Sequence, residues 1–127
     1  MSLASPLSRV RGLGSARSGT HHWWQQRLTA VALVPLGLWF IWAILGIDAT
    51  EHAAVVRWLR EPVTVVLLVL FLVALLHHAQ LGMQTVIEDY VEPEWQKIAC
   101  IVVVKFLAVF AGLASIVALC FVSLGLG

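Results

Sequence analysis

Three long apolar stretches constrain this chain more than any other feature. A helix needs about 20 apolar residues to cross the hydrocarbon core of a bilayer, and runs of this kind lie at about residues 24–46, 62–88 and 97–125. Hydrophobic residues make up 61% of the 127 residues and charged residues only 12%, which separates the chain from ordinary soluble domains. The sequence therefore predicts an all-α integral membrane protein, an up-and-down bundle of three transmembrane helices.

The borders of these stretches agree with this interpretation. Tryptophans near both ends of the first stretch suit the aromatic belts at membrane interfaces, and Pro62 opens the second, where proline is tolerated in a first helical turn. Lys105 interrupts the third, and its long stem can extend toward the interface. Neither an internal repeat nor a second domain is apparent. We therefore divide the chain into a basic N-terminal tail, residues 1–22, and a three-helix anchor domain, residues 23–127.

The distribution of charge predicts the orientation. The segment before and at the start of the first stretch contains four basic residues and no acidic one: Arg9, Arg11, Arg17 and Arg27. By the positive-inside rule this places the N-terminus in the cytoplasm, so the start of the first span and the end of the second share the inner face. An acid-free segment rich in arginine and serine also suits a mitochondrial presequence, but its brevity favours the inner membrane of a bacterium.

Several classes of function have no support in this chain. It contains no GxGxxG, GxxxxGK[ST], GxSxG or HExxH motif, and its two cysteines lie much farther apart than a CxxC pair, so nucleotide, hydrolase and zinc chemistry lack a site. The net charge of +1, with no basic patch, excludes nucleic acid as a partner. Any difficult catalytic step must take place on another subunit.

Two histidines near the end of the second span are the strongest functional signal, because an ionisable side chain inside a membrane needs a partner. The helical face of His78 continues through Gly82, Thr85 and Asp89, and these small or polar residues form a shallow groove. A flat macrocycle or a neighbouring helix can approach such a groove. The face of His77 carries Gln84 and Glu88 and offers less room. Spacing alone does not choose between the two histidines, but the glycine favours His78.

Imidazole is a common axial ligand of haem iron. Adjacent histidines on one helix cannot bind the same iron from opposite sides, so a second ligand would come from another chain. Asp89 and Tyr90 lie roughly 17 Å along the helix from His78, at 1.5 Å per residue, which brings them to the interface. There a phenol can bond a quinone carbonyl, a carboxylate can orient it or relay protons, and Arg27 can supply a cation. Alternatively, Tyr90 is an interfacial aromatic and Asp89 ends the helix.

Two segments resemble a known family. "GSARSGTHHWWQQRLTAVALVPL" and "HHAQLGMQTVIEDY" are similar to the small hydrophobic anchor subunit of succinate dehydrogenase, the cytochrome b anchor of respiratory complex II, in its bacterial form. The resemblance covers nearly the whole chain. Its specific part is the pattern His-x-x-x-Gly-x-x-x-x-x-x-Asp-Tyr, which His78, Gly82, Asp89 and Tyr90 fit without a gap.

The resemblance implies a role for each of these residues. His78 would be an axial ligand of a haem b shared with a second, cytochrome b-type anchor subunit, so that this chain forms one half of a heterodimeric membrane anchor. Gly82 and Arg27 would lie in the haem environment, and Tyr90 and Asp89 would bind ubiquinone. The family's flavoprotein and iron-sulfur subunits would oxidise succinate, leaving this chain non-catalytic toward succinate within an oxidoreductase complex.

Two other hypotheses remain open at this point. The chain can be a structural membrane adaptor that docks soluble subunits and binds no haem, with its histidines satisfied between helices. It can also be a proton-conducting subunit that uses His77, Glu88 and Asp89.

Overall fold

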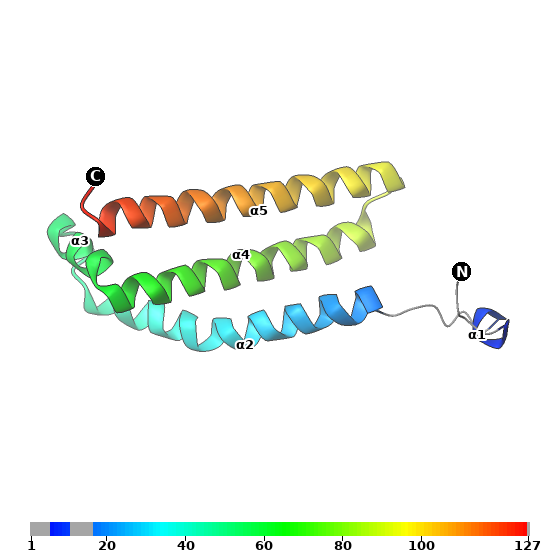
Figure 1. Ribbon diagram of the computed structural model, residues 1–127, viewed down its shortest axis with the longest axis horizontal. Helices are drawn as coiled ribbons and strands as arrows, with labels where there is room; N and C mark the ends of the chain where they lie inside the picture. The colour runs from blue at the N-terminus through cyan, green and yellow to red at the C-terminus, as the bar shows by residue number, and fades with distance from the viewer. Residues whose placement is uncertain (1–5, 11–16, 127) are drawn as a thin grey trace.

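The structure, a computed structural model, describes residues 6–10 and 17–126, and every regular element in these ranges is a helix (Figure 1). Three of the helices are long and apolar enough to cross a membrane, as the hydrophobic pattern predicts, so the all-α, three-span fold is confirmed. Arg11, one of the four basic residues used to predict the orientation, lies outside the described residues. In chain order the helices are α1 (Pro6–Val10), α2 (Arg17–Gly46), α3 (His52–Arg60), α4 (Pro62–Tyr90) and α5 (Glu94–Ser123).

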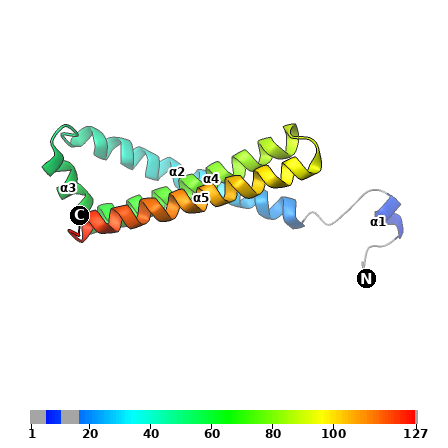
Figure 2. The same ribbon diagram turned by 90° about the horizontal axis from the view of Figure 1, so that it is seen from above.

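The three long helices form an open layer with α4 in the middle. α4 packs against α2 on one side and α5 on the other, whereas α2 and α5 make no contact within the described part of the chain (Figure 1). Viewed from above, α2 crosses the α4–α5 pair obliquely (Figure 2). Few side chains are buried in this arrangement: Ala43, Thr64, Leu68, Leu81, Ile87 and Leu119. Broad apolar faces are therefore left for lipid or for other subunits.

Lipid offers no partner for backbone N–H and C=O groups, so a spanning segment must satisfy them inside a helix. The ends of the helices follow from local sequence. Pro62 starts α4 in its first turn, where the missing N–H costs no hydrogen bond. At the end of α5, Gly125 adopts a φ of 71°, and Leu126 N–H donates to the Phe121 carbonyl at 2.9 Å. This Schellman-type stop needs glycine because a side chain is strained in the left-handed region.

The helix α3, between the first two spans, was not predicted from the sequence. Its Trp58 ring stacks on Trp39 of α2 with centroids 6.2 Å apart, and Phe40 of α2 stacks on Phe71 of α4 at 5.1 Å. Arg60 Nε also donates to the carbonyl of Val122 at the end of α5, at 3.2 Å. Trp58 and Arg60 thus hold α3 against α2 and α5, and α3 also packs against α4.

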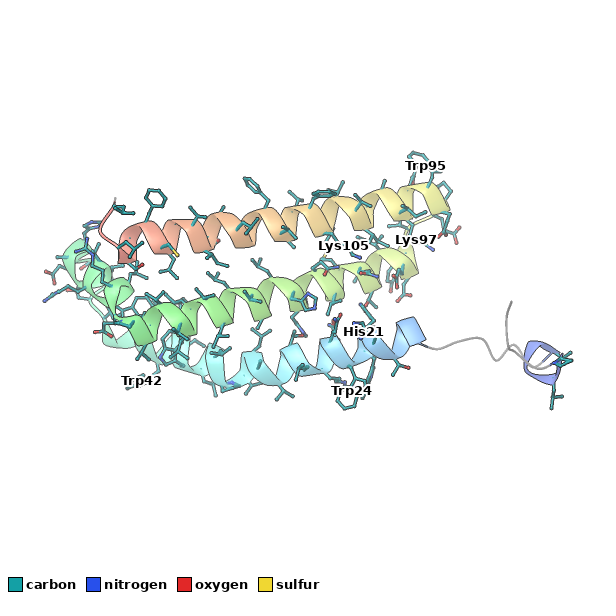
Figure 3. The ribbon with its side chains drawn as sticks, in the orientation of Figure 1. His21, Trp24, Trp42, Trp95, Lys97 and Lys105 are labelled. Carbon is teal, nitrogen blue, oxygen red and sulfur yellow. The ribbon has the colours of Figure 1, made fainter. Side chains whose placement is uncertain are left out.

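Tryptophans mark the two ends of the layer. Trp42 lies at the end that carries α3, and Trp24 and Trp95 lie at the opposite end (Figure 3). All three rings are exposed in this chain. Their positions suit the two interfaces of a bilayer, where indole places an apolar body in lipid and a polar N–H near water.

Candidate functional site

His78 faces α2 from the middle helix of the layer. Its Nδ1 lies 3.0 Å from the hydroxyl oxygen of Thr29, and both side chains are half-buried. The same hydroxyl lies 2.7 Å from the carbonyl oxygen of Gln25 and 3.1 Å from that of Gln26. Within the described residues, Nε2 of His78 has no hydrogen-bond partner. One ring nitrogen is thus held by this chain, and the other is left for a different partner.

Gly82 continues the face of His78, as helical spacing predicts. A β-carbon added at Gly82 would lie 3.8 Å from Nε2 of Gln26, so the glycine opens a small space against α2. Gln26 Oε1 and His22 Nε2 are buried without a hydrogen-bond partner in the described part of the chain. Buried polar atoms are nearly always paired in folded proteins. These two indicate that a further polar group completes the α2–α4 seam, which we define as His22, Gln26, Thr29, His78 and Gly82.

His77 lies on the other side of α4, facing α5. It lines a groove of about 490 Å³ together with Gln80, Lys105 and Gly112, and the remaining lining is aliphatic. Lys105 lies between α5 and α4 (Figure 3). Farther along α4, Gln80 donates to Gln84 at 3.2 Å and Gln84 donates to Glu88 at 2.8 Å. Gln80, Gln84 and Glu88 are therefore hydrogen-bonded along their own helix, whereas His77 itself makes no hydrogen bond within the described residues.

The proposed quinone residues lie at the last turn of α4. Tyr90 is 84% exposed and Asp89 is also exposed. Arg27 is exposed on α2, with its guanidinium carbon 5.4 Å from the centre of the Trp23 ring, a cation–π distance. No ion pair joins Arg27 to Asp89 within the described residues. This chain therefore presents the three side chains at its surface without assembling them into a closed site.

The structure also tests what kind of metal group the seam can hold. No cluster of three or more His, Cys, Asp and Glu side chains that could hold a metal ion is found in the described ranges. A haem brings four nitrogen ligands of its own and needs only an axial imidazole from each side. His78, the space at Gly82 and the unpaired polar atoms of His22 and Gln26 fit such a group.

Thr29 and Gln26 were not assigned roles from the sequence, and Lys105 was interpreted only as a lysine whose stem extends toward the interface. Thr29 and Gln26 share a face of α2 with His22, since positions i, i+4 and i+7 of a helix lie together. This polar stripe in an apolar helix was a signal that the sequence offered. The contact of Thr29 with His78, 49 residues later in the chain, became visible only once the helices were packed.

Together, the three apolar helices, their up-and-down order and the imidazole held inside the layer define a multi-pass integral membrane protein with a polar site between its helices. A sequence model of the succinate dehydrogenase/fumarate reductase transmembrane subunit family matches residues 1–112. The chain belongs to this family.

Individual relatives agree. The chain is 35% identical over 112 residues to the succinate dehydrogenase hydrophobic membrane anchor subunit of Rickettsia bellii, a match that covers 88% of this chain and 90% of the relative. It is 34% identical over 114 residues to the subunit of the same name in Rickettsia conorii, covering 89% and 90%. The corresponding subunit of Paracoccus denitrificans is 30% identical over 106 residues, with 84% and 82% covered.

Proposed function

We propose that this chain is the membrane anchor subunit of a succinate:ubiquinone oxidoreductase, in which it provides one axial ligand of a shared haem b and part of the quinone site. The observation that carries the proposal is the imidazole of His78. It lies in a membrane-spanning helix, its Nδ1 meets Thr29 at 3.0 Å, and its Nε2 has no partner among the described residues. A neutral imidazole held in this way suits an axial ligand.

We infer the partner subunits from the second haem ligand that this chain does not supply and from the surfaces that it exposes. The open layer leaves apolar faces uncovered, which favours a cytochrome b-type anchor subunit that supplies the second axial imidazole. Flavoprotein and iron-sulfur subunits would oxidise succinate and dock where Tyr90 and Asp89 are exposed. The relatives named above are membrane anchor subunits of succinate dehydrogenase, which supports this assembly. We place the complex in the inner membrane of a bacterium, with the N-terminus of this chain in the cytoplasm.

When bound, haem b supplies a one-electron redox centre within the membrane. The residues of this chain would hold it through His78 and give it space at Gly82, and His22 and Arg27 would offer hydrogen-bond donors beside it. At the interface the hydroxyl of Tyr90 donates a hydrogen bond to a carbonyl oxygen of ubiquinone. The neighbouring carboxylate of Asp89 orients that phenol and moves protons to the reduced quinone.

The two histidines provide the decisive experiment. The purified complex is reduced with dithionite and its difference spectrum recorded. We expect a b-type haem band that disappears in His78→Ala and survives in His77→Ala, because the two rings face opposite neighbours of α4. A wild-type complex without any haem band would refute the proposal and favour a structural adaptor. A band lost only in His77→Ala would move the ligand to the α4–α5 groove.

The quinone site is tested separately. Tyr90→Phe removes the phenolic hydroxyl and keeps the ring, so we expect slower succinate:ubiquinone reduction with unchanged succinate oxidation by a soluble acceptor dye. Equal rates of ubiquinone reduction in the variant and the wild type would exclude Tyr90 from the site.

A further inference from the structure

The hydroxyl of Thr29 has one proton and three polar atoms within hydrogen-bond distance. Two are backbone carbonyl oxygens of its own helix, those of Gln25 at 2.7 Å and Gln26 at 3.1 Å. The third is Nδ1 of His78, at 3.0 Å. A threonine inside a helix commonly donates its proton to the carbonyl four residues earlier, and 2.7 Å is the preferred O–H···O distance. The proton of Thr29 is therefore committed to Gln25.

Because Thr29 donates its proton to Gln25, the contact with Thr29 determines which ring nitrogen of His78 carries the proton. A hydroxyl oxygen that has donated its own proton still has lone pairs with which to accept. The 3.0 Å contact is then a hydrogen bond from Nδ1–H of His78 to the oxygen of Thr29. A neutral imidazole carries one N–H, so Nε2 keeps its lone pair. In the opposite arrangement, with Thr29 donating to Nδ1, the proton would lie on Nε2 and block a metal from binding there.

We infer that Thr29 is the positioning residue of His78: its hydroxyl accepts a hydrogen bond from Nδ1–H, which fixes the ring and the tautomer that offers Nε2 to the haem iron. The inference rests on the proposed function. It adds that Thr29 on α2 orients the haem ligand His78 on α4. The second nitrogen of a metal-bound imidazole usually needs such an acceptor, which also raises the basicity of the ligand. Here a neutral hydroxyl serves instead of a carboxylate.

The electronic consequence is measurable. Loss of the acceptor makes His78 a weaker electron donor to iron, and this removes more stabilisation from ferric haem than from ferrous haem. Thr29→Val replaces the hydroxyl by a methyl group of similar size. We therefore expect a higher haem midpoint potential in Thr29→Val and altered g values in the electron paramagnetic resonance signal of the oxidised complex. Thr29→Ser retains the hydroxyl, so its midpoint potential and g values should lie close to those of the wild type.

A matched control is available on α5. The hydroxyl of Ser115 donates to the carbonyl of Ala111 at 2.7 Å and makes no hydrogen bond to a histidine within the described residues. Ser115→Ala thus removes a backbone-bonded hydroxyl from the same layer but away from His78. It should change neither the midpoint potential nor the g values.

The outcomes separate this inference from the proposed function. A shifted potential in Thr29→Val, with serine rescue, supports the positioning role, as does haem loss in Thr29→Val that Thr29→Ser prevents. An assembled Thr29→Val complex with the wild-type potential and g values overturns the inference and leaves His78 as ligand. Identical defects in Thr29→Ser and Thr29→Val also overturn it, because the hydroxyl would then be irrelevant. A wild-type complex without haem refutes the proposed function and the inference together.

Discussion

Gly82 of α4 lies opposite the side-chain amide of Gln26 on α2, close enough that an added β-carbon would come within 3.8 Å of Nε2. This is an ordinary van der Waals distance. A methyl group therefore fits between the two helices as they stand, whereas a larger side chain must displace Gln26 or extend toward His78.

The space between Gly82 and Gln26 predicts that the haem content falls when the side chain at position 82 becomes larger than a methyl group. Gly82→Ala should assemble and keep its haem, and alanine should favour the helix by about 0.5–1 kcal/mol relative to glycine. Gly82→Leu should lower the haem content severalfold because the branched side chain fills the space beside His78. Haem content per complex, from the difference spectrum, is the measurement. Full haem loading in Gly82→Leu would show that the seam does not border the haem.

Lys105 lies on the α5 side of α4 with His77, whereas His78 lies on the α2 side. We therefore expect that Lys105 does not affect the haem. Lys105 lines the α5-side groove with His77, and a charged group within a membrane span costs about 2.5–3.5 kcal/mol on insertion scales. Lys105→Met keeps the length of the stem and removes the charge. We expect an unchanged haem spectrum and an equal or higher melting temperature of the complex. A weaker haem band in Lys105→Met would mean that the groove belongs to the haem site.

The three spans were predictable because lipid forces every backbone polar group into a helix, and the hydrophobic pattern records that requirement directly. The open layer was not predictable. Helices in lipid gain no hydrophobic energy from packing on one another, so their arrangement depends on close side-chain fit, as where a β-carbon on Gly112 would meet Leu76 at 3.3 Å. The helix α3 was missed for a similar reason, since its nine residues are held by tertiary contacts of Trp58.

The candidate site, like the fold, was predictable from the sequence only in part. The sequence placed His78 and Gly82 on one helical face and His77 on another, because the helical repeat is fixed by the backbone. Which face meets α2 depends on packing, and so does the contact of Thr29 with His78. The closing of a quinone site around Tyr90 needs surfaces that this chain does not contain.

The aromatic cluster at the α3 end gives a prediction about stability. Trp58 contacts Trp39 at 6.2 Å and Phe40 at 6.5 Å, and it is half-buried. Trp58→Ala removes both aromatic contacts between α3 and α2, and we expect the free energy of unfolding to fall by about 2 kcal/mol. Thermal unfolding and protease cleavage between α2 and α3 provide the measurements. Trp58→Phe, which keeps a ring in the cluster, should lose much less, and equal losses in the two variants would contradict a packing role.

The loop between α2 and α3 contains a carboxyl group with a perturbed pKa. The Thr50 hydroxyl donates to Oδ1 of Asp48 at 2.6 Å and the Thr50 backbone N–H donates to the same oxygen at 3.0 Å. These hydrogen bonds favour the charged form and lower the pKa of Asp48 from its ordinary value, the side-chain bond having the larger effect. Because the folded pKa is depressed, the stabilisation is present above the unfolded pKa and is lost as the pH falls through the folded pKa.

Thr50→Val removes the stronger of these two hydrogen bonds and should raise the pKa of Asp48 toward its ordinary value. The chain contains only one other aspartate, Asp89, so carboxyl-¹³C-labelled aspartate in the full-length chain gives two signals whose titration nuclear magnetic resonance can follow. Thr85→Val, a hydroxyl deletion in α4, serves as the control and should leave the titration of Asp48 unchanged. If the signal of Asp48 in Thr50→Val titrates at the wild-type pH, the hydroxyl of Thr50 does not hold this loop.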